Sequence, residues 1–178
     1  MTIYAVAHYQ LALFSYPMGV SSFFKYAATT ETGVFAQAQA GGHILSLHEY
    51  GGPLLSSRWG EALPLYPGQD PEDPSLPRYP DRGVLGGRYR HLYRDILIPR
   101  GEVIPLAITE ANLAIYDPDE RADLFLEDIF FYDERLREDD YVLGMAIFTL
   151  GGMSGWENFD YSEFLPELSE RIISLRNE

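Results

Sequence analysis

The sequence predicts an α/β fold made of parallel β/α units. Short apolar runs alternate along the chain with longer helical patterns, and this alternation indicates parallel strands joined by right-handed crossovers. The runs are continuously apolar, which is typical of strands buried on both faces. Each run stops at glycines or polar residues. We therefore expect about four strands and four helices in one domain that spans residues 1–178.

The apolar runs and their flanking residues give approximate bounds for these elements. Helical spacing of apolar side chains at every third or fourth residue separates the helices from the strands. We expect strands over residues 4–15, 43–48, 103–109 and 141–150, and helices over residues 21–40, 84–98, 119–137 and 163–175.

A long loop is expected between the second strand and the second helix. Residues 51–83 contain seven prolines together with several glycines and acidic residues. Loops of this length in compact domains are usually functional or disordered. The aromatic residues Trp59, Tyr66 and Tyr79 favour an ordered loop over a mobile linker.

The composition excludes several classes of protein. With 46% hydrophobic residues the chain can bury a sizeable core, so it is not a disordered protein. Its net charge of −14 argues against a nucleic-acid partner, since there is no basic stripe to displace counterions from phosphates. The same charge disfavours an anionic membrane surface. Solubility is the simplest explanation of the acidic balance.

No targeting segment, metal site or cofactor motif is recognisable. The N-terminal residues lack a basic region before an apolar run, and no stretch of about 18 apolar residues could span a bilayer. We therefore expect a cytoplasmic protein, or a secreted one if the chain is an N-terminally truncated fragment. The chain has no cysteine, and its four histidines lack metal-ligand spacing. No phosphate-binding glycine-rich loop follows a strand, so we expect neither a metal nor a cofactor.

Glu110 is the strongest candidate for a chemical role. It ends the apolar run 103–109, and β/α enzymes place their chemistry at the C-terminal ends of such strands. The alternative is an ordinary acid in a loop or at a helix N-terminus.

Four sequence segments together resemble a known family. They are Leu45-Ser46-Leu47-His48-Glu49-Tyr50-Gly51, then Ile108-Thr109-Glu110, then Phe131-Tyr132-Asp133 with Asp139-Asp140-Tyr141-Val142-Leu143-Gly144, and Phe148-Thr149-Leu150-Gly151 leading to Trp156. In this order they resemble the C-terminal half of a (β/α)8-barrel retaining glycoside hydrolase of the large cellulase- and xylosidase-like clan. The resemblance implies a TIM-barrel-type half-barrel whose strands correspond to the fifth to the eighth.

The resemblance also implies roles for particular residues. Glu110 would be the nucleophile that attacks a β-linked glycoside. Tyr50 would donate a hydrogen bond that keeps Glu110 ionised and aligned. Trp156 would stack on the apolar face of the sugar, and His48 would line the pocket.

The family's acid/base carboxylate has no clear counterpart in this chain. Retaining hydrolysis needs a second carboxyl group about 5–5.5 Å from the first. In the family it closes the fourth strand, which this chain does not contain. Glu49 is the nearest substitute, because it ends the strand next to that of Glu110. Side chains alternate along a strand, however, so Glu49 would face the barrel wall if Tyr50 faces the pocket.

Two functions stay open at this point. One is a retaining glycosidase half-barrel, which needs its other half from an upstream segment absent from this chain, from another polypeptide or from a second copy of itself. The other is a non-catalytic barrel remnant that binds carbohydrate or a protein partner through the proline-rich loop and Trp156. An open four-stranded sheet would expose strand edges and an apolar inner face, so we expect a homo-oligomer or a partner in either case.

Overall fold

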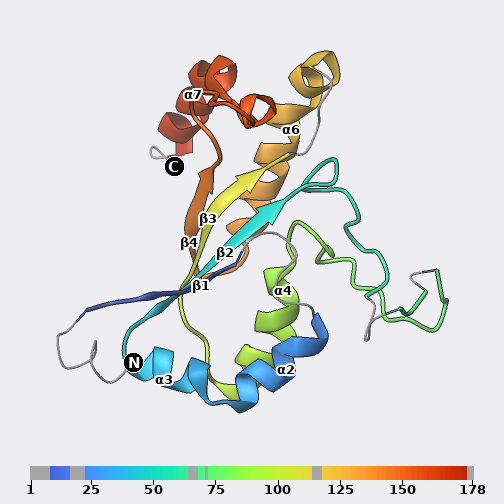
Figure 1. Ribbon diagram of the computed structural model, residues 1–178, viewed down its shortest axis with the longest axis vertical. Helices are drawn as coiled ribbons and strands as arrows, with labels where there is room; N and C mark the ends of the chain where they lie inside the picture. Colours follow the sequence, from blue (N-terminus) through green and yellow to red (C-terminus); the bar gives the residue numbers. More distant parts are fainter. Residues whose placement is uncertain (1–8, 17–22, 64–67, 71, 114–117, 176–178) are drawn as a thin grey trace.

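The computed structural model describes residues 9–16, 23–63, 68–70, 72–113 and 118–175. Its centre is a four-stranded parallel sheet in the order β1-β2-β3-β4 (Figure 1). The strands are β1 (Ala12–Tyr16), β2 (Ile44–Tyr50), β3 (Leu106–Asn112) and β4 (Val142–Ile147). The predicted α/β class with parallel strands is confirmed. Residues 4–8 of the first expected strand lie outside the described residues.

Helices follow the strands as the alternation predicts. The first expected helix is divided into α2 (Phe23–Glu31) and α3 (Val34–Ala40) by Gly33, whose φ of 73° lies in the left-handed region. The second is a continuous helical segment, α4 (Tyr89–Leu92), the π-helical η1 (Tyr93–Leu97) and α5 (Ile98–Arg100). The others are α6 (Pro118–Leu136) and α7 (Leu165–Leu175), with two short 3-10 turns, η2 (Glu157–Phe159) and η3 (Ser162–Phe164), before α7.

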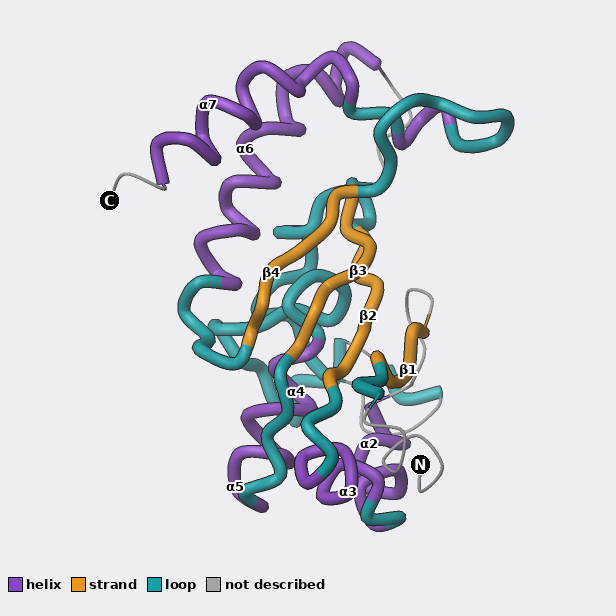
Figure 2. The backbone as a smooth tube through the Cα atoms, turned by 90° about the vertical axis from the view of Figure 1, so that its left-hand side faces the viewer, coloured by secondary structure: helices purple, strands orange, loops and turns teal. Residues whose placement is uncertain are grey.

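The core lies between one face of the sheet and the helices. Figure 2 shows β2, β3 and β4 in front, with the helices behind and beside them. The helix-facing side chains of the strands include four fully buried apolar residues: Leu45, Leu106, Ile108 and Ala111. They pack against buried side chains of the helices, which include Phe35, Tyr93, Leu97, Phe125 and Ile129. This burial supplies most of the driving force for the fold.

A β-bulge changes which residues of β3 face the open side of the sheet. Leu47 pairs with Ile108 but the next residue, His48, pairs with Glu110, so Thr109 is an extra residue in β3. As a result Thr109 and Glu110, although consecutive, both project to the open face. The Thr109 hydroxyl lies 2.7 Å from that of Ser46. The hydroxyl of Ser15 on β1 donates to Ser46 at 3.0 Å, so the open face carries a row of hydroxyl groups.

The predicted proline-rich loop packs against the rest of the protein where the structure describes it. Between β2 and α4 its described residues form only isolated bridges, such as Trp59 with Gly83. The backbone N–H groups of Leu55 and Ser56 donate to the buried carboxylate of Asp128 on α6. The Trp59 ring packs edge-on against Phe131 of the same helix, 5.5 Å between centroids. The loop is therefore anchored on the helix side of the sheet. Within the described segments, every helix is too short or too polar to cross a membrane.

Candidate functional site

Glu110, Tyr50 and His48 meet at the C-terminal ends of β3 and β2. The Tyr50 hydroxyl donates a 2.8 Å hydrogen bond to Glu110 Oε2, and His48 Nδ1 lies 3.1 Å from the same oxygen. Among the described residues no hydrogen-bond donor reaches Glu110 Oε1. The carboxylate is one-third exposed, with a side-chain exposure of 33%. Both contacts of the Glu110 carboxylate with these side chains are therefore made by Oε2.

The protonation of Tyr50 fits the role of a donor. Burial, the hydrogen bond to Glu110 and the charge of that carboxylate all raise the pKa of the Tyr50 hydroxyl. The phenol therefore keeps its proton over the physiological range.

An aromatic cluster links this carboxylate to Trp156. The Tyr50 ring contacts Phe159 edge-on at 5.7 Å between centroids, and it contacts Phe148 at 6.3 Å. Both phenylalanines in turn contact the indole of Trp156, at 5.4 Å and 5.7 Å. Trp156 is 46% exposed, so it presents a ring surface to solvent beside the Glu110 cluster. Aromatic faces of this kind suit the apolar face of a sugar or another flat apolar group.

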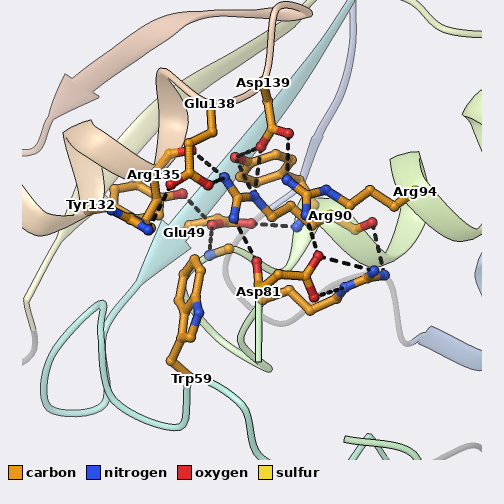
Figure 3. Close-up of polar contacts among 12 residues, drawn as sticks. Glu49, Trp59, Asp81, Arg90, Arg94, Tyr132, Arg135, Glu138 and Asp139 are labelled. Atoms are coloured by element: carbon orange, nitrogen blue, oxygen red, sulfur yellow. Dashed lines mark hydrogen bonds and ion pairs between the residues drawn. The ribbon is translucent and has the colours of Figure 1, made fainter. Parts of the chain in front are cut away.

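Glu49 belongs to a different site on the opposite side of β2. Its carboxylate accepts hydrogen bonds from the backbone N–H groups of Gly87 at 2.7 Å and Tyr89 at 2.9 Å, and from the Tyr132 hydroxyl (Figure 3). Burial raises the pKa of Glu49 to about 7, although these three donors act in the opposite direction. The structure therefore does not bring Glu49 to Glu110. The Glu49 carboxylate binds backbone and side-chain donors inside the protein and does not lie where the acid/base group of the resemblance would be.

A buried ion-pair network lies next to Glu49 and was not expected from the sequence. The guanidinium of Arg90 is fully buried and donates to Asp139 Oδ2 at 2.7 Å. Arg94 donates to the other oxygen of Asp139 at 2.8 Å, and the Tyr89 hydroxyl donates to Oδ2 at 2.7 Å. Burial would raise the pKa of Asp139, but the hydrogen bonds from Arg94 and Tyr89 and the charge of Arg90 hold it below its ordinary value.

This network ties the proline-rich loop to the helical segment that carries Arg90 and Arg94 and to the turn that follows α6. Arg90 also donates to the backbone carbonyl of Asp81 at 2.6 Å and to the Glu138 carboxylate at 3.0 Å. The Asp81 carboxylate pairs with Arg94 and Arg82 (Figure 3). These salt bridges lie on a helix face where Arg90 is fully buried and Arg94 is partly buried.

The described residues contain no group of three histidines or carboxylates that could hold a metal ion. Of the five residues singled out in the sequence, three are in contact, Trp156 joins them through Phe148 and Phe159, and Glu49 is separate. The fold and these contacts define an α/β protein with a donor-bound, partly exposed carboxylate at its C-terminal strand ends. In comparisons with protein-family models, curated proteins and solved structures, no match to this chain was found.

Proposed function

We propose that Glu110 is the nucleophile of a retaining β-glycosidase site. The observation that carries this proposal is the placement of both contacts on Oε2, the Tyr50 hydrogen bond at 2.8 Å and His48 at 3.1 Å. A nucleophilic carboxylate needs one aligned, unencumbered oxygen and must stay ionised. The exposed Trp156 ring supports the assignment, since it adds a stacking surface on the same side of the sheet.

Covalent trapping tests this role without requiring a general acid. In a 2,4-dinitrophenyl 2-deoxy-2-fluoro-β-glycoside the dinitrophenolate leaves with its bonding electrons and needs no proton. Glu110 would form an ester with the anomeric carbon, and the fluorine would slow its hydrolysis by disfavouring the oxocarbenium-like transition state. We expect intact-protein mass spectrometry to show one added fluoroglycosyl group and peptide mapping to place it on Glu110.

A matched pair of variants makes the trapping experiment specific. Glu110→Gln should take up no label, whereas Glu31→Gln, which changes an exposed acid at the end of α2, should label like the wild type. Labelling on any residue other than Glu110 would refute the assignment. A chain that binds oligosaccharides but is not labelled by gluco-, xylo-, manno- and galacto-configured reagents would instead support the second candidate, a non-catalytic carbohydrate-binding protein. That candidate is favoured by one observation, the position of Glu49 away from Glu110.

We further propose that the four-stranded sheet is completed into a barrel by a second copy of the chain. β1 and β4 are the outer strands of the sheet, so each has one edge without a strand partner among the described residues. An apolar groove of about 370 Å³ lies beside the β4 edge, between α6 and α7. Its apolar lining includes Ile129, Phe130, Met145, Ile147, Leu168 and Ile172, and the charged residues Asp133, Arg137 and Arg171 also line it. A two-fold axis along the strands would keep all eight strands parallel, as a closed β/α barrel requires.

Sedimentation velocity at micromolar concentration should then show a dimer. Leu143→Lys, on the exposed part of β4, should shift the chain toward monomer, because a charge at a buried strand edge is costly. Ile98→Lys, at an exposed site on α5, is the control and should leave the dimer intact. A wild-type chain that sediments as a monomer would contradict self-association and would point to completion by another polypeptide.

A further inference from the structure

A buried side-chain amide bridges the two ends of the loop that carries Trp156. Asn112, the last residue of β3, is fully buried, and its Nδ2 donates to the backbone carbonyl of Phe159 at 2.8 Å and to that of Phe148. Its Oδ1 accepts the backbone N–H of Leu113 at 2.7 Å. The two N–H groups of the amide therefore bind the carbonyls at the two ends of the segment 148–159.

The same residue joins the ends of three strands. The Asn112 backbone carbonyl accepts the N–H of Gly51, which directly follows Tyr50, at 2.9 Å. The preceding carbonyl, of Ala111, accepts the N–H of Phe148 at 3.0 Å. Within the loop, the backbone N–H of Thr149 donates to the carbonyl of Phe159 at 3.0 Å, so the two ends of the loop are also bonded to each other. The tip, in contrast, is solvent-exposed, with Leu150, Met153 and Trp156 all about half exposed or more.

We propose that Asn112 is a positioning residue that fixes the 148–159 loop and thereby sets the place of Trp156 relative to Glu110. Phe148 and Phe159 are the residues whose carbonyls Asn112 holds, and they are also the residues whose rings contact both Tyr50 and Trp156. A shift of either backbone carbonyl is therefore passed to the indole through the attached ring. The inference rests on the proposed function only in taking Trp156 as a ligand-contacting side chain.

Fluorine NMR on the intact chain tests this positioning role without substrate. The chain contains two tryptophans, so labelling with 5-fluorotryptophan gives one resonance for Trp156 and one for Trp59. Trp59 is an internal control, because it packs against α6 on the helix side of the sheet. In Asn112→Asp a carboxylate would face two carbonyl oxygens, and in Asn112→Ala both donors would be lost. We expect the Trp156 resonance to shift toward its unfolded position, with a larger solvent isotope shift, while the Trp59 resonance stays in place.

The exposed Asn158 provides matched controls on the same loop. Asn158→Asp and Asn158→Ala should leave both resonances unchanged. The proposal would be overturned if the Trp156 resonance did not move in folded Asn112 variants, or if both resonances moved together, as general loosening predicts. Failure of both Asn112 variants to fold would also overturn it, by assigning Asn112 to the stability of the sheet. Since no turnover is measured, these outcomes are independent of whether Glu110 is a nucleophile.

Discussion

Asp139→Ala should lower the free energy of unfolding by about 3–5 kcal/mol, the usual cost of removing one partner from a buried ion pair. The side chains of Arg90 and Asp139 are 0% and 5% exposed, so solvent screens their interaction little. Without the Asp139 carboxylate, Arg90 would remain buried with a weaker set of acceptors, and Arg94 and the Tyr89 hydroxyl would each lose a hydrogen-bond acceptor. Urea unfolding followed by circular dichroism measures the change.

The neighbouring acid offers a close control for this experiment. Asp140 is exposed and follows Asp139 directly, so Asp140→Ala changes the same charge at the same turn. Surface substitutions of this kind usually alter stability by less than about 0.5 kcal/mol. If Asp139→Ala lowers the free energy of unfolding by less than about 1 kcal/mol, water or shifted side chains must bind the Arg90 guanidinium. That result would contradict the structural role assigned to the network.

Glu49 should make the protein less stable as the pH rises from about 4.5 to about 7. Burial raises the folded-state pKa of this carboxyl from 4.5 to about 7. Below pH 4.5 Glu49 is protonated in both the folded and the unfolded chain, and its contribution to the free energy of unfolding is fully present. Between these pH values the unfolded chain releases the proton first, so stability falls by about 3 kcal/mol and then levels off.

His91 has the opposite pH dependence, so wild type must be compared with a variant. Burial and the charge of Arg82 lower the pKa of His91 in the folded protein to about 4. As the pH falls below 6.5 the unfolded chain therefore takes up the proton first, and the stability of the folded state decreases. The two slopes largely cancel in the wild type. Glu49→Gln, a neutral isostere of the protonated acid, should remove one slope, so that its stability relative to wild type rises by about 3 kcal/mol from pH 4.5 to 7.5.

Denaturant unfolding at several pH values measures this difference. Glu170→Gln, at an exposed position on α7, controls for the loss of one surface carboxylate. A stability difference between wild type and Glu49→Gln that does not vary with pH would show that Glu49 ionises normally in the folded protein.

The placement of His48, Tyr50 and Glu110 at one edge of the sheet was predictable from the sequence, whereas the side of the sheet that Glu110 faces depends on the bulge at Thr109. Parallel strands place their C-terminal ends at one edge of a sheet, and alternation puts His48 and Tyr50 on the same face of β2. The same alternation predicts that Glu49 points the other way, as the structure shows. For β2 these inferences need only the alternation of side chains to continue through Tyr50, two residues beyond the end of the expected strand.

The bulge at Thr109 and the buried state of Arg90 were not predictable in this way. A strand with one extra residue has the same apolar run as a regular strand, so nothing local marks the bulge. Arg90 and Asp139 are 49 positions apart, and a helical pattern does not show which arginine is covered by a distant segment. Gly33, in contrast, gave a local signal, because glycine weakens a helix and readily adopts a positive φ.

The opposed directions of neighbouring side chains in β2 have a mechanical consequence for the site. On the helix side of the sheet, Glu49 holds the end of this strand through hydrogen bonds from two backbone N–H groups and from the Tyr132 hydroxyl. His48 and Tyr50 are therefore held in place by bonds that do not occupy the side on which Glu110 lies. Support from the opposite side of the strand favours preorganisation, since a ligand then meets donors that need no reorientation.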